Sequence, residues 1–213
     1  MTQKSASPRD RYRTHVRAEI KERAWAQIAG AGASALSLNA IAKQMGMTGP
    51  ALYRYFAGRD ELITELVTDA YRSLADTFRA AAADGAGLAE LAHALRRWAL
   101  DDPQRYFLIY GTPVPGYQAP DDITTIATDI MATLLDACAA VPAGGAETAL
   151  DAHLAHHRGW GGSRPVPALR RALTFWTRLH GVLSLELSGQ FTGMDFDPAQ
   201  LFAAELDNLL ASR

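Results

Sequence analysis

The residues with the clearest chemistry in this chain lie between Ser37 and Arg59, in the run SLNAIAKQMGMTGPALYRYFAGR. Ser37 and Thr48 each precede a short helical pattern, where a side-chain hydroxyl can cap the helix. Because helix N-termini present free N–H groups, both positions could also hold a phosphate oxygen. Tyr53 and Tyr55 each carry a phenol that can donate to phosphate. These residue types predict hydrogen bonding to a phosphodiester backbone.

Two short helices joined by a tight turn must position these side chains. The first carries an apolar face, and Gly46 ends it; the face comprises Leu38, Ile41, Ala42 and Met45. In the second, Pro50 falls in the first turn, where its missing N–H breaks no helical hydrogen bond. Leu52 and Phe56, four residues apart, should both point into a core. In a helix-turn-helix, the second helix lies in the DNA major groove while the first crosses the backbone.

Small and basic residues around the second helix predict how it would meet a duplex. Gly49, Pro50 and Ala51 are small enough for the helix end to enter a groove, and Ala51 could touch a thymine methyl group. Arg59 could reach a phosphate from the start of the following helix. Because Gly49 has no side chain, base readout would depend on Arg54 or on DNA shape. The alternative is that the two tyrosines only pack a three-helix core.

This stretch resembles the TetR family of regulators over residues 12–70, the first third of the chain. The matching features, in register, are Ile41–Ala42, Gly46, Thr48, the run LYRYF at 52–56, Arg59 and Asp60–Glu61–Leu62. The arginine at position 59 departs from the pattern, in which lysine is commoner. The resemblance implies DNA contacts by Thr48, Gly49, Pro50, Ala51, Tyr53, Tyr55 and Arg59. Ser37 and Arg54 join them through the capping and charge arguments above.

The distribution of charge favours a basic module followed by an acidic one. Residues 1–59 contain ten Lys and Arg against three Asp and Glu, whereas residues 60–213 contain eleven against twenty. We therefore predict a DNA-binding domain over 1–59 and a ligand-binding and dimerisation domain over 60–213. Arg9, Arg11 and Arg13 could form an arm that reaches the minor groove or a phosphate. A solvated tail and a chance clustering of charge are the alternatives.

Helical periodicity continues through the rest of the chain, and no segment alternates as several strands would. Helices are expected near 58–83, 88–100, 103–110, 121–140, 147–156, 168–190 and 198–211, separated by Pro/Gly loops at 111–120 and 159–167. The predicted fold class is all-α: an N-terminal three-helix helix-turn-helix domain, then a larger helical domain, with about nine to ten helices.

Aromatic residues in the larger domain suggest a small-molecule site. The candidates are Trp98, Tyr106, Tyr110, Phe175, Trp176 and His180. Apolar cavities with a few polar groups are the usual form of such sites, although an ordinary core would look similar. The runs WTRLHG at 176–181 and PQRYFLIYGTPVPGY at 103–117 resemble the WHG-type C-terminal domain of one TetR branch. That resemblance implies a cavity for a small, largely apolar effector and a dimer built from the last two long helices.

The last two helices carry broad apolar stripes that suit a homodimer interface. The residues concerned are Leu169, Leu173, Leu183, Leu187, Leu201, Phe202, Leu206 and Leu209. In a two-fold symmetric dimer, the two DNA-binding domains, or reading heads, would match the two halves of a palindromic operator. Alternatively, the stripes fold back onto the chain's own core.

Several other kinds of chemistry are not expected. No apolar run reaches eighteen residues, so no membrane span is predicted. Cys138 is the single cysteine, so no intrachain disulfide can form, and a cytoplasmic location fits. His153, His156 and His157 form an H-x-x-H-H cluster without the companions of a catalytic metal motif. We expect no metal, no cofactor and no enzyme activity.

The sequence thus predicts an operator-binding transcriptional regulator, acting as a repressor that a small-molecule effector releases from double-stranded DNA. Effector binding would shift the helix that begins at residue 58 and so change the spacing of the two reading heads. One rival is a helical enzyme or small-molecule carrier without operator binding. Another is an architectural DNA-binding protein without an effector.

Overall fold

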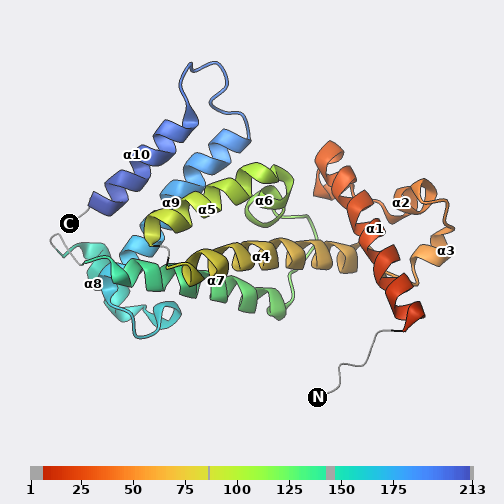
Figure 1. Cartoon of the computed structure of the whole chain (residues 1–213), viewed down its shortest axis with the longest axis horizontal. Helices are drawn as coiled ribbons and strands as arrows, with labels where there is room; N and C mark the ends of the chain where they lie inside the picture. Colours follow the sequence, from red (N-terminus) through yellow and green to blue (C-terminus); the bar gives the residue numbers. More distant parts are fainter. Residues whose placement is uncertain (1–6, 86, 143–146, 212–213) are drawn as a thin grey trace. The chain divides into compact units, whose positions relative to one another are not determined.

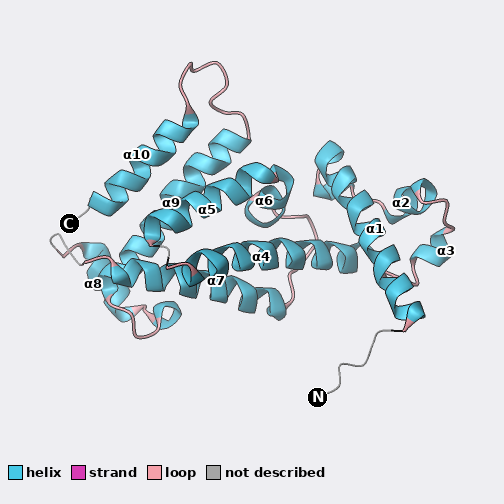
Figure 2. Cartoon of the chain, in the orientation of Figure 1, coloured by secondary structure: helices cyan, strands magenta, loops and turns pink. Residues whose placement is uncertain are grey.

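The computed structural model describes residues 7–85, 87–142 and 147–211, and within these ranges the chain is helical with no strand (Figure 2). The all-α class is therefore confirmed. Ten α-helices appear in the described residues (Figure 1): α1 Pro8–Ala31, α2 Leu38–Gln44, α3 Gly49–Leu52, α4 Arg59–Ala83, α5 Leu88–Asp101, α6 Pro103–Tyr110, α7 Asp121–Ala140, α8 Ala149–His156, α9 Val166–Leu187 and α10 Pro198–Ala211. Two 3₁₀ turns, η1 Ala33–Ala35 and η2 Gly159–Gly161, complete the list.

Apart from α3, the predicted helices match these bounds, with small shifts that local chemistry explains. α8 begins at Ala149 because Thr148 caps it, accepting a hydrogen bond from the Asp151 N–H at 3.3 Å. α9 begins two residues before the predicted start, with Pro167 in its first turn, and ends at Leu187. Gly189 then takes a left-handed φ of 74°, which stops the helix.

The described residues form two compact units. One comprises residues 7–70 and 104–120, and the other comprises residues 71–103 and 121–211 within the described ranges. The domain boundary predicted at 59 falls on Arg59, the first residue of α4. The first unit extends beyond that point to Ala70 and takes in α6 after Pro103 and the loop that follows it.

The first unit buries apolar residues of α1, α2 and α4 together with Leu52 and Phe56. α1 buries one residue per turn: Val16, Ile20, Ala24 and Ile28. Leu52 and Phe56 are both fully buried, as their spacing predicts. α1 starts early because Ser7, Pro8 and Asp10 form a capping box with proline in the first turn. It ends where the Gly32 N–H bonds the Ile28 carbonyl at 2.8 Å and φ turns to 77°.

The second unit packs α9 against α5, α7, α8 and α10. Arg96 of α5 and Glu186 of α9 form an ion pair at 2.6 Å with both side chains largely buried. The buried Arg171 of α9 donates to three carbonyls at the end of α7: Cys138 at 2.7 Å, Val141 at 3.1 Å and Pro142 at 3.0 Å. Since the last carbonyls of a helix lack intrahelical partners, Arg171 acts as the cap of α7.

Helix α7 is the one described helix that is long and apolar enough, by length and composition alone, to cross a membrane. One face of α7 is buried in the second unit, through Ile130, Leu134, Leu135 and Cys138. The helix packs through contacts with α5 and α9. α7 thus packs on the second unit by one face, and 28% of its apolar window is buried.

A close approach at Gly161 gives a first prediction. A Cβ at this position would lie 2.7 Å from the Leu169 side chain, well inside van der Waals contact. Because overpacking a well-filled core costs about 1–3 kcal/mol, Gly161→Ala should destabilise the fold by about that amount in urea unfolding. Gly159→Ala, in the same 3₁₀ turn but with open space around its Cβ, is the matched control. Equal stability of the two variants would contradict the packing argument.

Candidate DNA-binding interface

Helix α2 and the turn after it are formed as the sequence predicts. The Ser37 hydroxyl accepts a hydrogen bond from the Ala40 N–H at 3.3 Å and caps α2. Ile41 and Ala42 are buried. Gly46 takes a φ of 65°, which glycine adopts without the steric penalty of other residues. The Met47 N–H then bonds the Ala42 carbonyl at 2.8 Å, and this closes the turn.

Helix α3 is shorter than predicted, and this changes the setting of the tyrosines. It ends at Leu52, so Tyr53, Arg54 and Tyr55 lie in the turn that follows and not on the helix itself. The expectation that the Thr48 hydroxyl caps this helix is wrong, since its side chain makes no capping hydrogen bond. A helix of four residues has few free N–H groups to share. Thr48 is instead exposed.

The remaining predicted contact residues of this segment lie at or near the surface. Tyr53 is 48% exposed. Pro50 and Arg54 are exposed, whereas Gly49, Ala51 and Tyr55 are half-buried. The alternative in which both tyrosines serve only as core residues is therefore excluded for Tyr53. Leu52 and Phe56 fill the core in their place.

The basic N-terminal residues belong to a helix, so the alternative of a disordered, solvated tail is wrong, while their contact with DNA stays a prediction. Arg9, Arg11 and Arg13 lie in the first two turns of α1. The Asp10 carboxylate accepts from the Ser7 N–H and hydroxyl, and these hydrogen bonds lower the pKa of Asp10. The sequence carried the signal, because Ser-Pro-Arg-Asp is a capping box with proline in the first turn.

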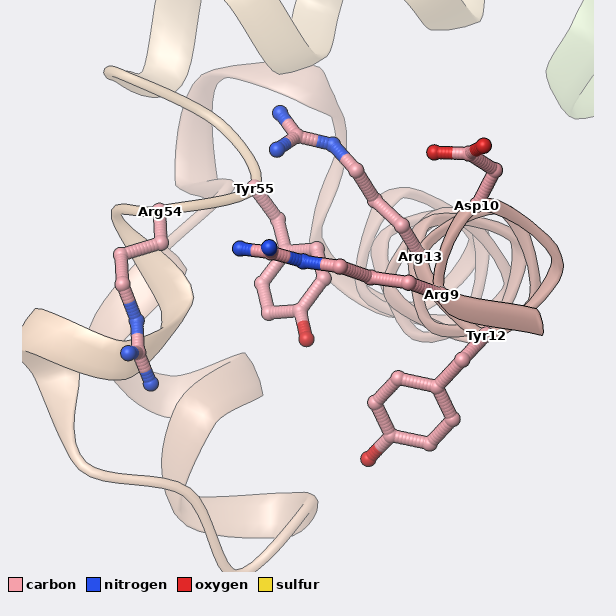
Figure 3. Close-up of a pocket in the computed structure, with 6 residues that line it drawn as sticks. All are labelled: Arg9, Asp10, Tyr12, Arg13, Arg54 and Tyr55. Carbon is pink, nitrogen blue, oxygen red and sulfur yellow. The ribbon is translucent and has the colours of Figure 1, made fainter. Parts of the chain in front are cut away.

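A cleft lies between the start of α1 and the turn after α3, and we call it the α1–α3 cleft (Figure 3). It has a volume of about 520 Å³, and its lining residues are Arg9, Asp10, Tyr12, Arg13, Arg54 and Tyr55. Arg9 and Arg13 extend from α1 toward Tyr55, and Arg54 lies on the other side of that ring (Figure 3). Three guanidinium groups against one carboxylate make the cleft positively charged. Guanidinium and phenol groups both donate to phosphate oxygens.

Arg17 holds the turn that forms one wall of the cleft. Its guanidinium donates to the Tyr55 carbonyl and lies 4.0 Å from the centre of the Phe56 ring. It also forms ion pairs with Glu65 and, at 3.4 Å, with Glu61 of α4. One side chain thus fixes α1, the turn after α3 and α4 to one another. Sequence reasoning missed it because the partners lie 38–48 residues away.

Arg59 is engaged within the first unit. Its Nη2 donates to the carbonyls of Ala33 at 3.0 Å and Ser34 at 3.3 Å. Its Nη1 lies 3.8 Å from the Asp60 carboxylate. The predicted phosphate contact would have to use the donors that remain, which an arginine with five N–H groups can supply.

The predicted ligand residues divide between the two units. Tyr106 and Tyr110 of α6 belong to the first, with ring centres 5.5 Å apart. Trp98, Phe175, Trp176 and His180 belong to the second. Trp98 donates to the Ser73 hydroxyl at 3.1 Å, and the Trp176 and His180 rings lie 4.4 Å apart. Burial lowers the pKa of His180 to about 4, so its imidazole is neutral at pH 7.

Most of the predicted dimer residues lie in the core of their own chain. Leu169, Leu183, Phe202, Leu206 and Leu209 are at most 3% exposed. They can add little area to an interface, because α9 and α10 bury these positions within the second unit. Leu173, Leu187 and Leu201 are half-buried. Of the predicted interface residues, these three are therefore the ones with surface left for a partner.

The histidine cluster and the cysteine, for which no metal binding or catalysis was predicted, lie in the following environments. His153, His156 and His157 are exposed, and the rings of His153 and His157 stack with centres 4.2 Å apart. Within the described ranges, no three His, Cys, Asp or Glu side chains are placed to hold a metal ion. Cys138 is fully buried, and burial raises the pKa of its thiol to about 12.

Comparison with known proteins shows two matching family models. Residues 20–66 match the model of bacterial regulatory proteins of the tetR family. Residues 88–209 match the model of the tetracyclin repressor-like C-terminal domain. The first match contains α2 and α3 with the turns around them, and the second covers more than half of the chain.

Relatives and solved structures agree over nearly the whole length. An HTH-type transcriptional regulator of Mycobacterium tuberculosis is 36% identical over 93% of this chain and 92% of its own, and one of Mycobacterium bovis matches equally. A solved structure of a candidate regulatory protein is 73% identical, with a TM-score of 0.88 over 96% of this chain and 99% of its own. The fatty acid degradation regulator FadR of Bacillus halodurans, 17% identical, has a TM-score of 0.55 over 92% of this chain and 98% of its own, and so shares the fold.

The predicted resemblance is thus confirmed over both parts of the chain. The helix-turn-helix lies within the match to the N-terminal family model, and the helical second part lies within the match to the C-terminal one. The named relatives at 36% identity are transcriptional regulators. The chain therefore belongs to the TetR family of transcriptional regulators and carries that family's DNA-binding domain.

Proposed function

We propose that this protein binds double-stranded operator DNA as a homodimer, with the α1–α3 cleft seated on the phosphate backbone and α3 directed into the major groove. The observation that supports this proposal is the cleft, whose lining includes Arg9, Arg13, Arg54 and Tyr55. Charge-assisted hydrogen bonds from such groups hold phosphate more strongly than neutral ones do. Thr48, Pro50 and Tyr53 are exposed beside it and available to the groove.

We propose that the protein represses transcription. A small and largely apolar effector, bound in the domain of residues 60–213, would relieve the repression. Trp98, Phe175, Trp176 and His180, which belong to one unit, would line that site. Effector binding would shift α4 and change the spacing of the two reading heads. A coupling of about 1–3 kcal/mol between the two sites is enough to change operator occupancy. A cytoplasmic location accompanies this role.

The dimer is proposed to form through the outer faces of α9 and α10. Leu173, Leu187 and Leu201 offer the accessible part of the predicted stripe, and Leu185 is 46% exposed on the same pair of helices. Large exposed apolar side chains in a group commonly mark an interface. Sedimentation of the purified protein tests this point, because a monomer at micromolar concentration would exclude it.

The operator-binding proposal is tested by electrophoretic mobility shift with the DNA immediately upstream of the gene for this chain. A competing fragment of equal length and scrambled sequence serves as the control. Specific protein–DNA complexes exceed non-specific ones by about 10³-fold or more, so the scrambled fragment should compete poorly. Equal competition would leave only a non-specific binder, and no shift at any salt concentration would favour the rival carrier or enzyme.

Trp176→Ala tests the effector site. The variant should bind DNA with an affinity within about threefold of the wild-type affinity, because Trp176 lies outside the DNA-binding helices. A threefold change corresponds to less than the 1.4 kcal/mol of a tenfold change. Compounds that raise the melting temperature of the wild-type protein in a thermal-shift screen should no longer release DNA from the variant. Trp160→Ala, which removes a 41% exposed tryptophan from η2, is the control. An unchanged response in Trp176→Ala would count against the site.

A further inference from the structure

A second cavity lies within the first unit, between the end of α1 and the α6 segment, and we call it the α1–α6 cavity. Its volume is about 310 Å³. One wall is made by Ile28, Gly32, Ala33 and Ser34, and the other by α6 and the loop from Thr112 to Pro115. The cavity is partly open to solvent, since Gly32, Ser34, Thr112, Pro113 and Pro115 of its lining are exposed. Its volume lies at the lower end of the range of small-molecule pockets, about 300–1,000 Å³.

The lining chemistry defines what the cavity could accept. Its apolar surface comes from Ile28, Phe107, Leu108, Pro113, Val114 and Pro115. Gln104, Ser34 and Thr112 add neutral hydrogen-bonding groups, and none of the lining residues is charged. An ion bound there would lose part of its hydration without gaining a partner of opposite charge. The fitting ligand is neutral and mostly apolar, with one or two hydrogen-bonding groups.

The walls of the cavity are tied to the elements that position the reading head. Arg59, at the start of α4, holds the carbonyls of Ala33 and Ser34. Three residues later, the Ser37 N–H donates to Gln27 Oε1 at 2.9 Å while its hydroxyl caps α2. The segment 33–37 therefore joins the cavity wall directly to the N-terminus of α2.

The opposite wall is also anchored. The loop after α6 is tied to α4 by a hydrogen bond of 3.1 Å between the hydroxyls of Tyr117 and Thr64. Both walls thus connect to α4 at points six residues or fewer from its N-terminal turn. A molecule between the walls would add contacts to both and restrain their separation.

We propose that the α1–α6 cavity binds a neutral, largely apolar small molecule and that its occupant stiffens segment 33–37 at the cap of α2. None of its lining residues is among the proposed effector residues, and all of them belong to the first unit. A ligand can shift an equilibrium only by its differential affinity for two states. Contact with both walls supplies such a difference whenever the walls move apart.

Disulfide tethering in the full-length chain tests the site. Ser34→Cys places a thiol in the lining, and Ala35→Cys places one on the next residue of η1, exposed and outside the lining. Each variant is equilibrated with a mixture of benzyl mercaptan and 2-mercaptoethanesulfonate disulfides, and the adducts are weighed by mass spectrometry. The wild-type chain is the blank, because the buried Cys138 should not react.

The benzyl-to-sulfonate ratio at position 34 should exceed that at position 35 by about tenfold, since burying an apolar ring of this size is worth more than 1.4 kcal/mol. Ratios that agree within about twofold would overturn the proposal. Val114→Trp, added to Ser34→Cys, should fill the cavity and remove the preference, with circular dichroism confirming the fold. If this variant fails to fold, the comparison of positions 34 and 35 still decides.

Hydrogen exchange tests the stiffening, and it needs no DNA. The backbone amides of residues 35–41 should exchange about fivefold more slowly in the benzyl adduct of Ser34→Cys than in its sulfonate adduct, as expected when local opening becomes costlier. Amides of α10 are the internal control and should not change. Equal exchange of segment 35–41 in the two adducts would overturn the claim that the occupant restrains it.

Discussion

Replacing Arg54 with glutamate is expected to lower the affinity for upstream DNA by at least 100-fold at 0.1 M salt, because two losses add in each protomer of the proposed dimer. A charge-assisted hydrogen bond to phosphate is worth about 1.5–3 kcal/mol. Repulsion between the new carboxylate and the phosphate adds about 1 kcal/mol or more near a protein surface. Together they approach the roughly 3 kcal/mol that a 100-fold change requires. Fluorescence anisotropy with labelled DNA measures the change.

Arg79→Glu is the matched control for this variant. Arg79 is on α4 and 67% exposed, and its ion pair with Asp76 at 2.5 Å lies on the helix surface. The substitution makes the same change in net charge, far along the chain from the cleft residues. It should alter DNA affinity by no more than about threefold, through long-range electrostatics that salt screens. Equal losses in the two variants would mean that net charge, and not the cleft, governs binding.

Replacing Arg171 with methionine is expected to destabilise the second unit by about 3–5 kcal/mol, because three hydrogen bonds from a charged group are lost and each contributes about 1.5–3 kcal/mol. The loss leaves the carbonyls of Cys138, Val141 and Pro142 without the donors that now satisfy them. In a protein of this size each kcal/mol lowers the melting temperature by about 2–4 °C. A fall of about 10 °C or more in a thermal melt is the expected result.

Arg178→Met provides the comparison on the same helix. Its guanidinium is 51% exposed and pairs with Glu205 at 3.3 Å, and exposed ion pairs contribute about 0–1 kcal/mol. Arg171→Lys keeps the charge, but one ammonium group lacks the planar fork that serves three carbonyls. It should therefore fall between the other two variants. A thermal melt of Arg171→Met within about 2 °C of Arg178→Met would contradict the capping role.

Local signals were enough to predict most of the fold. Helix bounds follow from features that neighbouring residues supply, such as the Ser37 cap, the left-handed Gly46 and the paired spacing of Leu52 and Phe56. The helical start of α1 was visible in the same way, in Ser7 and Asp10, but the cluster of arginines was interpreted as an arm or a solvated tail. Charge was given more weight there than capping chemistry.

The site could be predicted only where its parts adjoin in the sequence. The residues of the α2–α3 segment were found, because caps, turn and tyrosines occur in one run. The α1–α3 cleft was not found, since it joins Tyr12 and Arg13 to Tyr55 across more than forty residues. Arg17 was overlooked for the same reason. Tertiary contacts of this kind leave no local pattern.

The apolar stripes on the helices also did not identify the surface against which each stripe packs. The spacing of Leu169, Leu183 and Phe202 shows that one face of each helix is buried, but it does not say against what. In the structure these residues pack within their own chain. An interface can be inferred only from what remains exposed once the chain has folded, and that remainder is small on α9 and α10.

The salt dependence of DNA affinity tests the role of the cleft most directly. Anisotropy titrations from 50 to 300 mM salt give the slope of log K against log salt concentration, which falls by about 0.9 for each phosphate contact. The combined variant Arg9→Gln, Arg13→Gln and Arg54→Gln should have a slope about 5 smaller in magnitude than the wild type, because the proposed dimer loses three contacts in each protomer. A slope identical to that of the wild type would show that these arginines do not hold the phosphate backbone.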